Sequence, residues 1–237
     1  MKVVAIIQAR MGSSRLPGKV LMDLHGRPVL DHVLTRLRRA RGVNMIGLAT
    51  SNLPADDAIE TWAAGQGVPI HRGSEEDVLD RFHAAALAWQ ADVVVRITAD
   101  CPILDPDVVS AAVAAYLEAP CDYLSNAVER TYPDGLDVEV FSQAALQRAW
   151  EQATSPRHRE HVTSYFYDHP DQFQLKALRQ SVDRSRLRWT LDTPDDLRFL
   201  RAVFAAMEHP HFGQQEVLDL LEREPSIQEI NMAGAKP

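Results

Sequence analysis

The sequence is poor in features that mark exported, membrane-bound or nucleic-acid-binding proteins. It contains only two cysteines, Cys101 and Cys121, which excludes a disulfide framework and favours a reducing compartment. No apolar stretch is long enough to span a bilayer, and the first residues show no cleavable signal pattern. The net charge of −8 argues against a general nucleic-acid-binding surface. These observations predict a cytoplasmic protein that binds neither nucleic acid nor membrane.

Two common nucleotide-binding motifs are also missing. The Walker A pattern needs four residues between its glycine and the Gly-Lys pair, with Ser or Thr next. Here five residues separate Gly12 from Gly18, and Val20 follows Lys19. The glycine pattern of dinucleotide-binding domains does not follow the first apolar run. The sequence therefore argues against both a P-loop ATPase and a Rossmann dehydrogenase.

What the sequence does have is a basic, glycine-containing loop directly after its first apolar run. Residues 3–7 are apolar and β-branched, and the loop of residues 8–19 follows them without a break. Gly12 and Gly18 let the backbone fold closely around a ligand. Three cations lie in the same loop, namely Arg10, Arg15 and Lys19. Such a loop is suited to a polyphosphate, although a basic surface turn is the alternative interpretation.

The pattern of apolar runs predicts an α/β fold with a mostly parallel sheet. Runs typical of buried strands occur at about 2–8, 44–49, 68–71, 92–98 and 186–191. Helical patterns lie between most of them, and a strand that alternates with a helix implies parallel pairing. Helix-start signals stand at 54–57, 74–77, 105–107 and 193–196. We expect a single domain over residues 1–237 with five or six βα units.

The pattern changes between about 122 and 185. Residues 136–141 alternate like a half-exposed strand, helical patterns follow at 142–153 and 156–168, and a further strand-like piece lies at 173–179. We expect a small antiparallel and helical insertion, placed before the last strand of the main sheet. Residues 231–237 are expected to fray.

Two aspartates stand where a predicted strand ends. Asp100 closes the run at 92–98, and Asp192 closes the run at 186–191. Ligands of open α/β sheets bind at the carboxyl ends of the strands, and magnesium is typically held by one or two carboxylates. Together with the basic loop, this pair predicts a metal-assisted phosphoryl or nucleotidyl transfer site. The alternative for Asp100 is a simple turn, while Asp195 and Asp196 are interpreted as part of a helix start.

Other polar clusters have both a structural and a functional interpretation. Ser74 and Asp77 are close to a capping box, yet that helix start would lie near the crevice, where Arg72 or Ser74 could contact a nucleoside. The Asp-x-Asp pattern at 105–107 resembles a glycosyltransferase motif but is better explained as a helix start. The basic cluster at 156–161 could pair with an acidic sugar, or form a solvated helix face or a subunit contact.

Four of these segments, in this order, resemble the cytidylyltransferase family. They are residues 7–19 (IQARMGSSRLPGK), 72–79 (RGSEEDVL), 100–102 (DCP) and 191–194 (LDTP). The likeness extends over nearly the whole chain, and the spore coat polysaccharide biosynthesis protein F branch is the most similar one. The family includes the synthetases of CMP-activated 3-deoxy sugar acids and acylneuraminates. Ala99 departs from the glycine that sugar-acid synthetases often carry before the aspartate.

The resemblance implies a Rossmann-like nucleotide-diphospho-sugar transferase fold with helices on both faces of the sheet. It implies transfer of CMP from CTP to a sugar acid, with release of pyrophosphate, Mg²⁺ as cofactor and a role in surface polysaccharide synthesis. It also implies a homodimer in which residues 122–185 form the subunit contact and help to cover the sugar. Two other interpretations stay open. One is a metal-dependent glycosyltransferase or another NTP:sugar nucleotidyltransferase, and the other is a non-catalytic nucleotide-binding accessory protein.

The resemblance also assigns roles to individual residues. The expected catalytic residues are Arg10, Lys19, Asp100 and Asp192, and the last two are the expected metal ligands. The expected nucleotide-binding residues are Gln8, Ala9, Arg10, Gly12, Ser13, Arg15, Lys19, Arg72, Gly73, Ser74 and Asp77. For the acidic sugar, the predicted residues are Arg157, His158 and Arg159.

Overall fold

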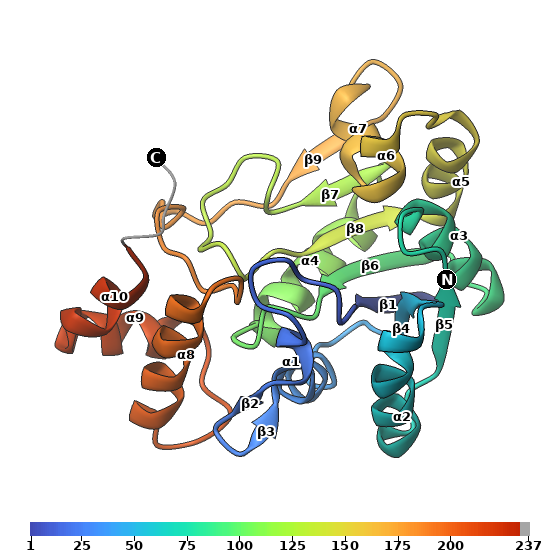
Figure 1. Cartoon of the computed structure of the whole chain (residues 1–237). Coiled ribbons are helices and arrows are strands. Elements are labelled where there is room, and N and C mark those ends of the chain that lie inside the picture. The colour runs from blue at the N-terminus through green and yellow to red at the C-terminus, as the bar shows by residue number, and fades with distance from the viewer. Residues whose placement is uncertain (233–237) are drawn as a thin grey trace.

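The computed structural model describes residues 1–232, which fold around one seven-stranded sheet (Figure 1). The strand order is β5-β4-β1-β6-β8-β7-β9. Its strands are β1 (Val3–Gln8), β4 (Met45–Ser51), β5 (Ile70–Gly73), β6 (Val93–Thr98), β7 (Tyr123–Ser125), β8 (Glu139–Ser142) and β9 (Leu175–Ala177). Only β8 runs antiparallel to its neighbours, β6 and β7. A separate small hairpin pairs β2 (Asp23–Leu24) with β3 (Arg27–Pro28).

Helices cover both faces of the sheet because successive residues of the central strands point to opposite sides. In β1, Ala5 and Ile7 belong to one core cluster, whereas Val4 and Ile6 belong to the other. The first cluster includes α1 (Val29–Leu37), α2 (Asp57–Gln66), α4 (Pro106–Glu118), α8 (Pro194–Ala206), α9 (Gln214–Arg223) and α10 (Pro225–Met232). The second includes α3 (Val78–Ala88), α5 (Gln143–Gln152) and α7 (Ser164–Asp168). Short α6 (Pro156–Glu160) packs on α3 and α7, and the 3-10 helices are η1 (Lys19–Leu21) and η2 (Pro54–Asp56).

This architecture confirms the predicted α/β class, and the first four predicted strands form the parallel part of the sheet. The fifth prediction, a strand at 186–191, is wrong. That segment makes a single isolated bridge, between Arg188 and Asp134. Its apolar side chains, Trp189 and Leu191, are buried in the first core cluster. The position beside β6 is taken by β8, so the insertion supplies strands to the main sheet and leaves no place for this run.

Three further expectations are corrected by the structure. The strand near 136–141 is not half exposed, because Val138, Glu139 and Val140 are all buried. The helical pattern at 156–168 is divided into α6 and α7, with a break after α6 at His161. Residues 231–232 do not fray, since they belong to α10 and Asn231 is buried. The rest of the segment expected to fray, 233–237, lies outside the described residues.

The predicted helix starts are mostly confirmed. Asp105 caps α4 by accepting from the N–H of Asp107, and Thr193 caps α8 in a full capping box with Asp196. At the start predicted for 74–77, the cap of α3 is Asp77 rather than Ser74, because the Asp77 carboxylate accepts from the N–H of Asp80. Within residues 1–232, no helix combines the length and the apolar character needed to cross a membrane.

Candidate functional site

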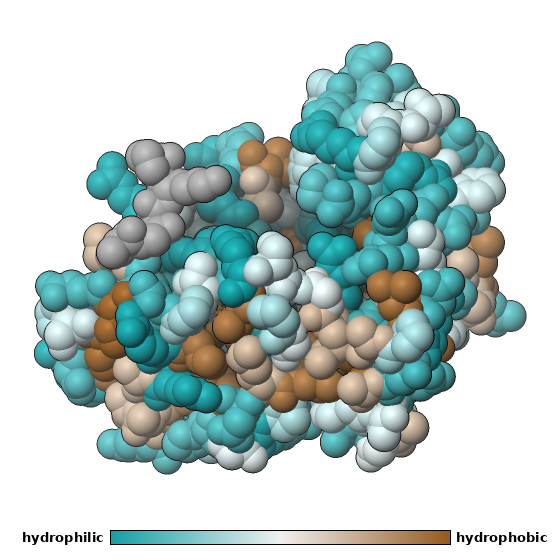
Figure 2. Space-filling view, in the orientation of Figure 1, coloured by the Kyte–Doolittle hydropathy of each residue, from teal (hydrophilic) through white to brown (hydrophobic). Residues whose placement is uncertain are grey.

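The basic loop and both predicted aspartates meet in one cavity beyond the carboxyl ends of β1 and β6. Figure 2 shows the face of the molecule on which this cavity lies. The surface is hollowed between the insertion, at the upper right, and the rest of the molecule below it. The cavity is lined by Gln8, Ala9, Arg10, Gly12, Ser13, Ser14, Arg15, Lys19, Val20, Thr98, Ala99, Asp100 and Asp192. The structure therefore brings together all the predicted residues of the first loop with Asp100 and Asp192.

Lys19 lies between the two aspartates. Its ammonium Nζ donates to Asp100 Oδ2 at 2.6 Å, to Asp192 Oδ1 at 2.8 Å and to the Leu191 carbonyl at 2.8 Å. The preceding Gly18 has a φ of 71°, which turns the chain into η1 and starts the 3-10 helix at Lys19. Burial alone would lower the pKa of Lys19, but Asp100 and Asp192 outweigh it and raise that pKa. Lys19 therefore stays protonated and brings a positive charge to the cavity.

Asp192 is surrounded by cations. Besides Lys19, its carboxylate contacts Arg15 at 3.1 Å and Arg188 at 2.7 Å. Burial acts to raise the pKa of Asp192, but these three cations lower it to about 2. Asp192 is therefore ionised throughout the physiological range and can serve as a permanent anionic ligand.

The two carboxylates fit a divalent metal ion. One oxygen of Asp100 and one of Asp192 converge on a single point, which the Lys19 ammonium occupies, and the Leu191 carbonyl faces the same point. These are hard oxygen donors of the kind that magnesium prefers. In the part of the chain that the structure describes, no group of three or more acidic, His or Cys side chains converges in this way. A two-carboxylate site suits an ion that takes its other ligands from water and substrate phosphate.

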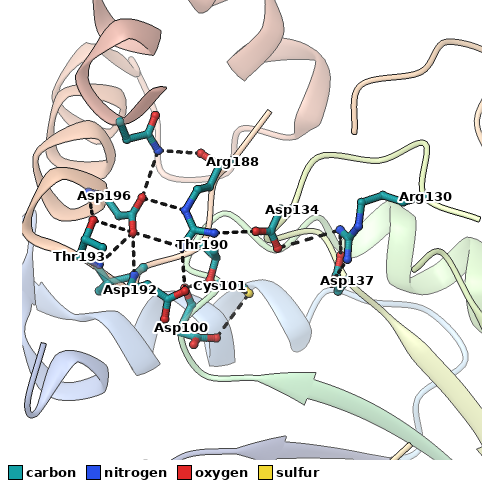
Figure 3. Close-up of polar contacts among 12 residues, drawn as sticks. Asp100, Cys101, Arg130, Asp134, Asp137, Arg188, Thr190, Asp192, Thr193 and Asp196 are labelled. Atoms are coloured by element: carbon teal, nitrogen blue, oxygen red, sulfur yellow. Dashed lines mark hydrogen bonds and ion pairs between the residues drawn. The ribbon is translucent and has the colours of Figure 1, made fainter. Parts of the chain in front are cut away.

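Arg188 organises the Asp192 side of the cavity, and the sequence analysis did not identify it. It lies at the centre of Figure 3, where its guanidinium binds Asp134 at 2.9 Å, Asp192 at 2.7 Å and Asp196 at 3.2 Å. Asn231 of α10 donates to the Arg188 carbonyl at 2.9 Å, so the last described helix supports the same segment. These carboxylates raise the pKa of Arg188 despite its burial. The feature of the sequence that could have pointed to Arg188 is its place between two apolar residues, Leu187 and Trp189.

Asp56 binds the backbone of the basic loop, although the sequence analysis assigned it only to a helix start. Its side chain caps no N–H of α2. Instead, Asp56 Oδ1 accepts from the N–H of Met11 at 2.7 Å, and Oδ2 accepts from Thr50 Oγ1 at 3.0 Å and from the N–H of Ser51 at 3.1 Å. This buried carboxylate thus ties the loop after β1 to the end of β4.

The predicted nucleoside contacts after β5 are only partly brought to the cavity. Arg72 turns away from it and pairs with Asp57 at 2.7 Å and Glu60 at 2.6 Å. Gly73 leaves room for Arg81, because a Cβ at Gly73 would lie 3.2 Å from the Arg81 side chain. A second cavity adjoins the first through their shared residue Arg10. It is lined by Arg10, Ser74, Glu75, Glu76, Asp77, Thr154, Pro156, Arg159 and Glu160.

The predicted sugar-binding residues divide into two groups. Arg157 and His158 both bind Asp168 within the insertion. Arg159 instead donates to Asp77 at 2.6 Å, which ties α6 to the start of α3 beside the second cavity. Arg159 is thus the member of this cluster that lines a cavity together with Arg10 of the basic loop.

A third cavity lies between the sheet and the insertion and shares Thr98 with the first. Its lining residues are Arg96, Thr98, Ala127, Arg130, Asp137, Glu139, His161, Thr163, Ser164 and Tyr167. Arg130 holds Asp137 in a two-bond pair at 2.6 and 2.7 Å. Of these residues, His161 belongs to the basic cluster at 156–161 that could pair with an acidic sugar, and the sequence analysis named no other for a ligand.

Comparison with known proteins identifies the family. A model of the family described as cytidylyltransferase matches residues 4–223. The spore coat polysaccharide biosynthesis protein SpsF of Bacillus subtilis is 35% identical over 234 residues, covering 94% of this chain and 95% of the relative. The 3-deoxy-manno-octulosonate cytidylyltransferase of Anaeromyxobacter dehalogenans (strain 2CP-C) is 30% identical over 86% of this chain and 98% of its own length.

A solved structure supports the same assignment at the level of the whole fold. The cytidylyltransferase from Leptospira borgpetersenii superposes with a TM-score of 0.93 at 30% identity, and the match covers 96% of this chain and 97% of that one. Because the family model spans nearly the whole chain and the basic loop lies inside the matched region, the resemblance seen in the sequence is confirmed. This protein belongs to the cytidylyltransferase family.

Proposed function

We propose that this protein transfers CMP from CTP to a sugar acid and releases pyrophosphate, in the synthesis of a surface polysaccharide. The observation that carries the proposal is the convergence of Asp100, Asp192 and Lys19 at the base of a cavity whose rim is the basic loop. Membership of the cytidylyltransferase family supports CTP as the donor. The names of two relatives, one a spore coat polysaccharide protein and one a sugar-acid cytidylyltransferase, support the acceptor class.

The cavity residues can carry out this reaction by positioning and charge. A hydroxyl oxygen of the acceptor attacks the α-phosphorus of CTP and forms a new P–O bond. The bond between the α-phosphorus and the bridging oxygen breaks, its electron pair leaves with pyrophosphate, and the hydroxyl proton passes to solvent. Arg10, Arg15 and Lys19 bind the phosphates and stabilise the charge that develops on the leaving group.

Asp100 and Asp192 would hold a magnesium ion where the Lys19 ammonium now lies. When bound, such an ion supplies charge neutralisation at the phosphate oxygens. Lys19 has the flexible stem to move from the two carboxylates toward a phosphate. The role of Arg188 in this arrangement is to keep Asp192 ionised and oriented.

Pyrophosphate release from CTP tests the proposal. With magnesium, release should require a sugar acid, with 3-deoxy-manno-octulosonic acid and N-acetylneuraminic acid as the first two acceptors. Asp100→Ala and Asp192→Ala should each reduce the rate at least about a hundredfold. Asp195→Ala is the matched control, because Asp195 pairs only with Arg198 on the surface of α8.

Three outcomes would contradict parts of the proposal. Full activity in either cavity variant, with circular dichroism like that of the wild type, would exclude the metal site. Selective thermal stabilisation by a UDP-sugar rather than by CTP would indicate a glycosyltransferase, because a ligand stabilises the fold that binds it. Tight CTP binding without turnover over a broad panel of sugar acids would indicate an accessory protein.

A further inference from the structure

The side chain of Gln8 lies where the first and third cavities meet. Gln8 is the last residue of β1 and lines the first cavity. Its register partner on β6 is Thr98, which lines both cavities. Arg96, two residues earlier on β6, lines the third cavity and contacts the Gln8 carboxamide. A molecule that occupies both cavities would lie against Thr98, and Gln8 is the neighbour of Thr98 on β1.

Arg96 fixes which end of the Gln8 carboxamide faces the cavity. Its Nε and Nη2 both donate to Gln8 Oε1, at 3.2 and 2.9 Å. A guanidinium has only donors, so the carboxamide oxygen must face Arg96 and the NH₂ group must face away. Within residues 1–232, no acceptor binds Gln8 Nε2. The donor end of the carboxamide is thus left for a ligand.

A buried carboxylate holds Arg96 in turn. The third nitrogen of the guanidinium, Nη1, binds Glu139 on the adjacent strand β8. Glu139 also accepts from Tyr123 and Thr163, each at 2.6 Å, and from Tyr167 at 2.9 Å. Burial acts to raise the pKa of Glu139, but Arg96, Thr163 and Tyr123 lower it. With all its nitrogens engaged, Arg96 cannot rotate without breaking a buried network.

We infer that Gln8 binds an oxygen atom of the acceptor sugar acid and helps to select the acceptor, and that Arg96 and Glu139 are positioning residues that hold its NH₂ group toward that oxygen. The inference rests on the proposed function. The phosphates have three cations of the basic loop as partners, whereas Gln8 lies next to Thr98 and Arg96, which line the third cavity beside the insertion. A fixed neutral donor there recognises a hydroxyl or carboxylate oxygen and contributes no charge of its own.

Gln8→Glu is the sharpest test. The variant carboxylate still accepts from Arg96 and gains an ion pair, but it removes both donor hydrogens and faces the acceptor with a negative charge. In steady-state pyrophosphate release, the KM for the sugar acid should rise at least about tenfold. The KM for CTP should stay within about twofold, because the phosphate contacts are unchanged. The melting temperature should equal or exceed that of the wild type.

Two more variants separate this role from a structural one. Gln8→Met removes donor and acceptor without adding charge and should raise the KM for the sugar acid by a smaller factor. Tyr123→Phe is the matched control, because it removes a donor to Glu139 and leaves Gln8 and Arg96 in place. It should lower the melting temperature and leave both KM values as in the wild type.

The possible failures are distinguishable. An active wild type with an unchanged sugar-acid KM in Gln8→Glu would overturn this inference alone, as would a rise confined to the KM for CTP. A wild type that releases no pyrophosphate in response to any sugar acid would overturn the proposed function and this inference together.

Discussion

At the scale of single residues, the cavity is defined by charges that compensate one another. Lys19 neutralises Asp100 and Asp192, and Arg15 and Arg188 add further positive charge around Asp192. The whole chain is acidic, with a net charge of −8, so this cavity is a local exception to the overall charge. A polyphosphate and a divalent cation entering together would preserve the balance, since each brings the charge that the other needs.

The depressed pKa of Asp192 predicts how stability depends on pH. The folded-state pKa is about 2, below the ordinary value of 3.8. The ionised form is therefore favoured by folding, and this stabilisation is complete above pH 4 to 5 and is lost as the pH falls toward 2. Urea unfolding of wild type and Asp192→Asn should be compared from pH 2 to 7. The difference in unfolding free energy should be largest near neutral pH and should shrink as the pH falls from about 5 to 2.

Asp195→Asn serves as the control for this titration. Asp195 is an exposed carboxylate whose partner, Arg198, lies on the same helix, and such surface pairs contribute little. Its substitution should change the unfolding free energy by less than about 1 kcal/mol at every pH. An Asp192→Asn difference that is the same at pH 2 and pH 7 would contradict the assigned role of the three cations.

At the scale of elements, the sequence predicts best where a strand is central and long. The strands β1, β4 and β6 consist mainly of apolar or small residues, most of them buried, and their positions could be read directly. The run at 186–191 has three apolar residues among two arginines and Thr190, and it forms no strand, because apolar residues report burial and not pairing. The three-residue strand β7 is too short to show a period, whereas β9 lies inside the strand-like piece expected at 173–179. Whether a buried run joins a ladder depends on its neighbours in space.

The same limit applies to the site. Asp100 and the basic loop could be predicted because each follows a strand, and that position has a known geometry in α/β sheets. Asp192 reaches the same cavity although the buried segment before it forms no strand. Arg188 and Asp56 could not, because their roles depend on contacts with segments far away in the sequence. For Arg188 the distant partner is Asp134, 54 residues earlier in the chain.

Gly135 is the element-scale test of how the Asp192 segment is held. Its φ is 106°, and a Cβ there would lie 2.7 Å from the backbone N of Thr190. The neighbouring Asp134 carbonyl accepts from the N–H of Trp189 at 2.6 Å. Gly135→Ala should therefore lower the unfolding free energy by about 2 kcal/mol or more and reduce turnover, since the segment must shift.

Gly65→Ala is the matched control in the same measurement. Gly65 lies within α2, and a Cβ there would meet nothing within 4 Å. Alanine in a helix interior should raise the unfolding free energy by about 0.5–1 kcal/mol and leave turnover unchanged. Equal effects of the two substitutions would show that the turn at Gly135 does not support the Asp192 segment.

At the scale of the whole molecule, three adjoining cavities lie near the carboxyl ends of the parallel strands. The first and second share Arg10, and the first and third share Thr98. The basic loop lines the first cavity, in the middle of this series. The second cavity lies between the start of α3 and α6 of the insertion, and the third between β6 and other residues of the insertion. The arrangement suits a reaction that joins two molecules across the loop, as the proposed transfer of CMP to a sugar acid does.

The most direct test of this account follows the phosphorus atoms of the donor. CTP labelled at the α- or the γ-phosphorus is incubated with magnesium and the sugar acid that supports pyrophosphate release. The α-label should appear in the sugar product, and the γ-label should appear only in pyrophosphate. A sugar that carries the γ-label, or one recovered without either label, would contradict nucleotidyl transfer at this cavity.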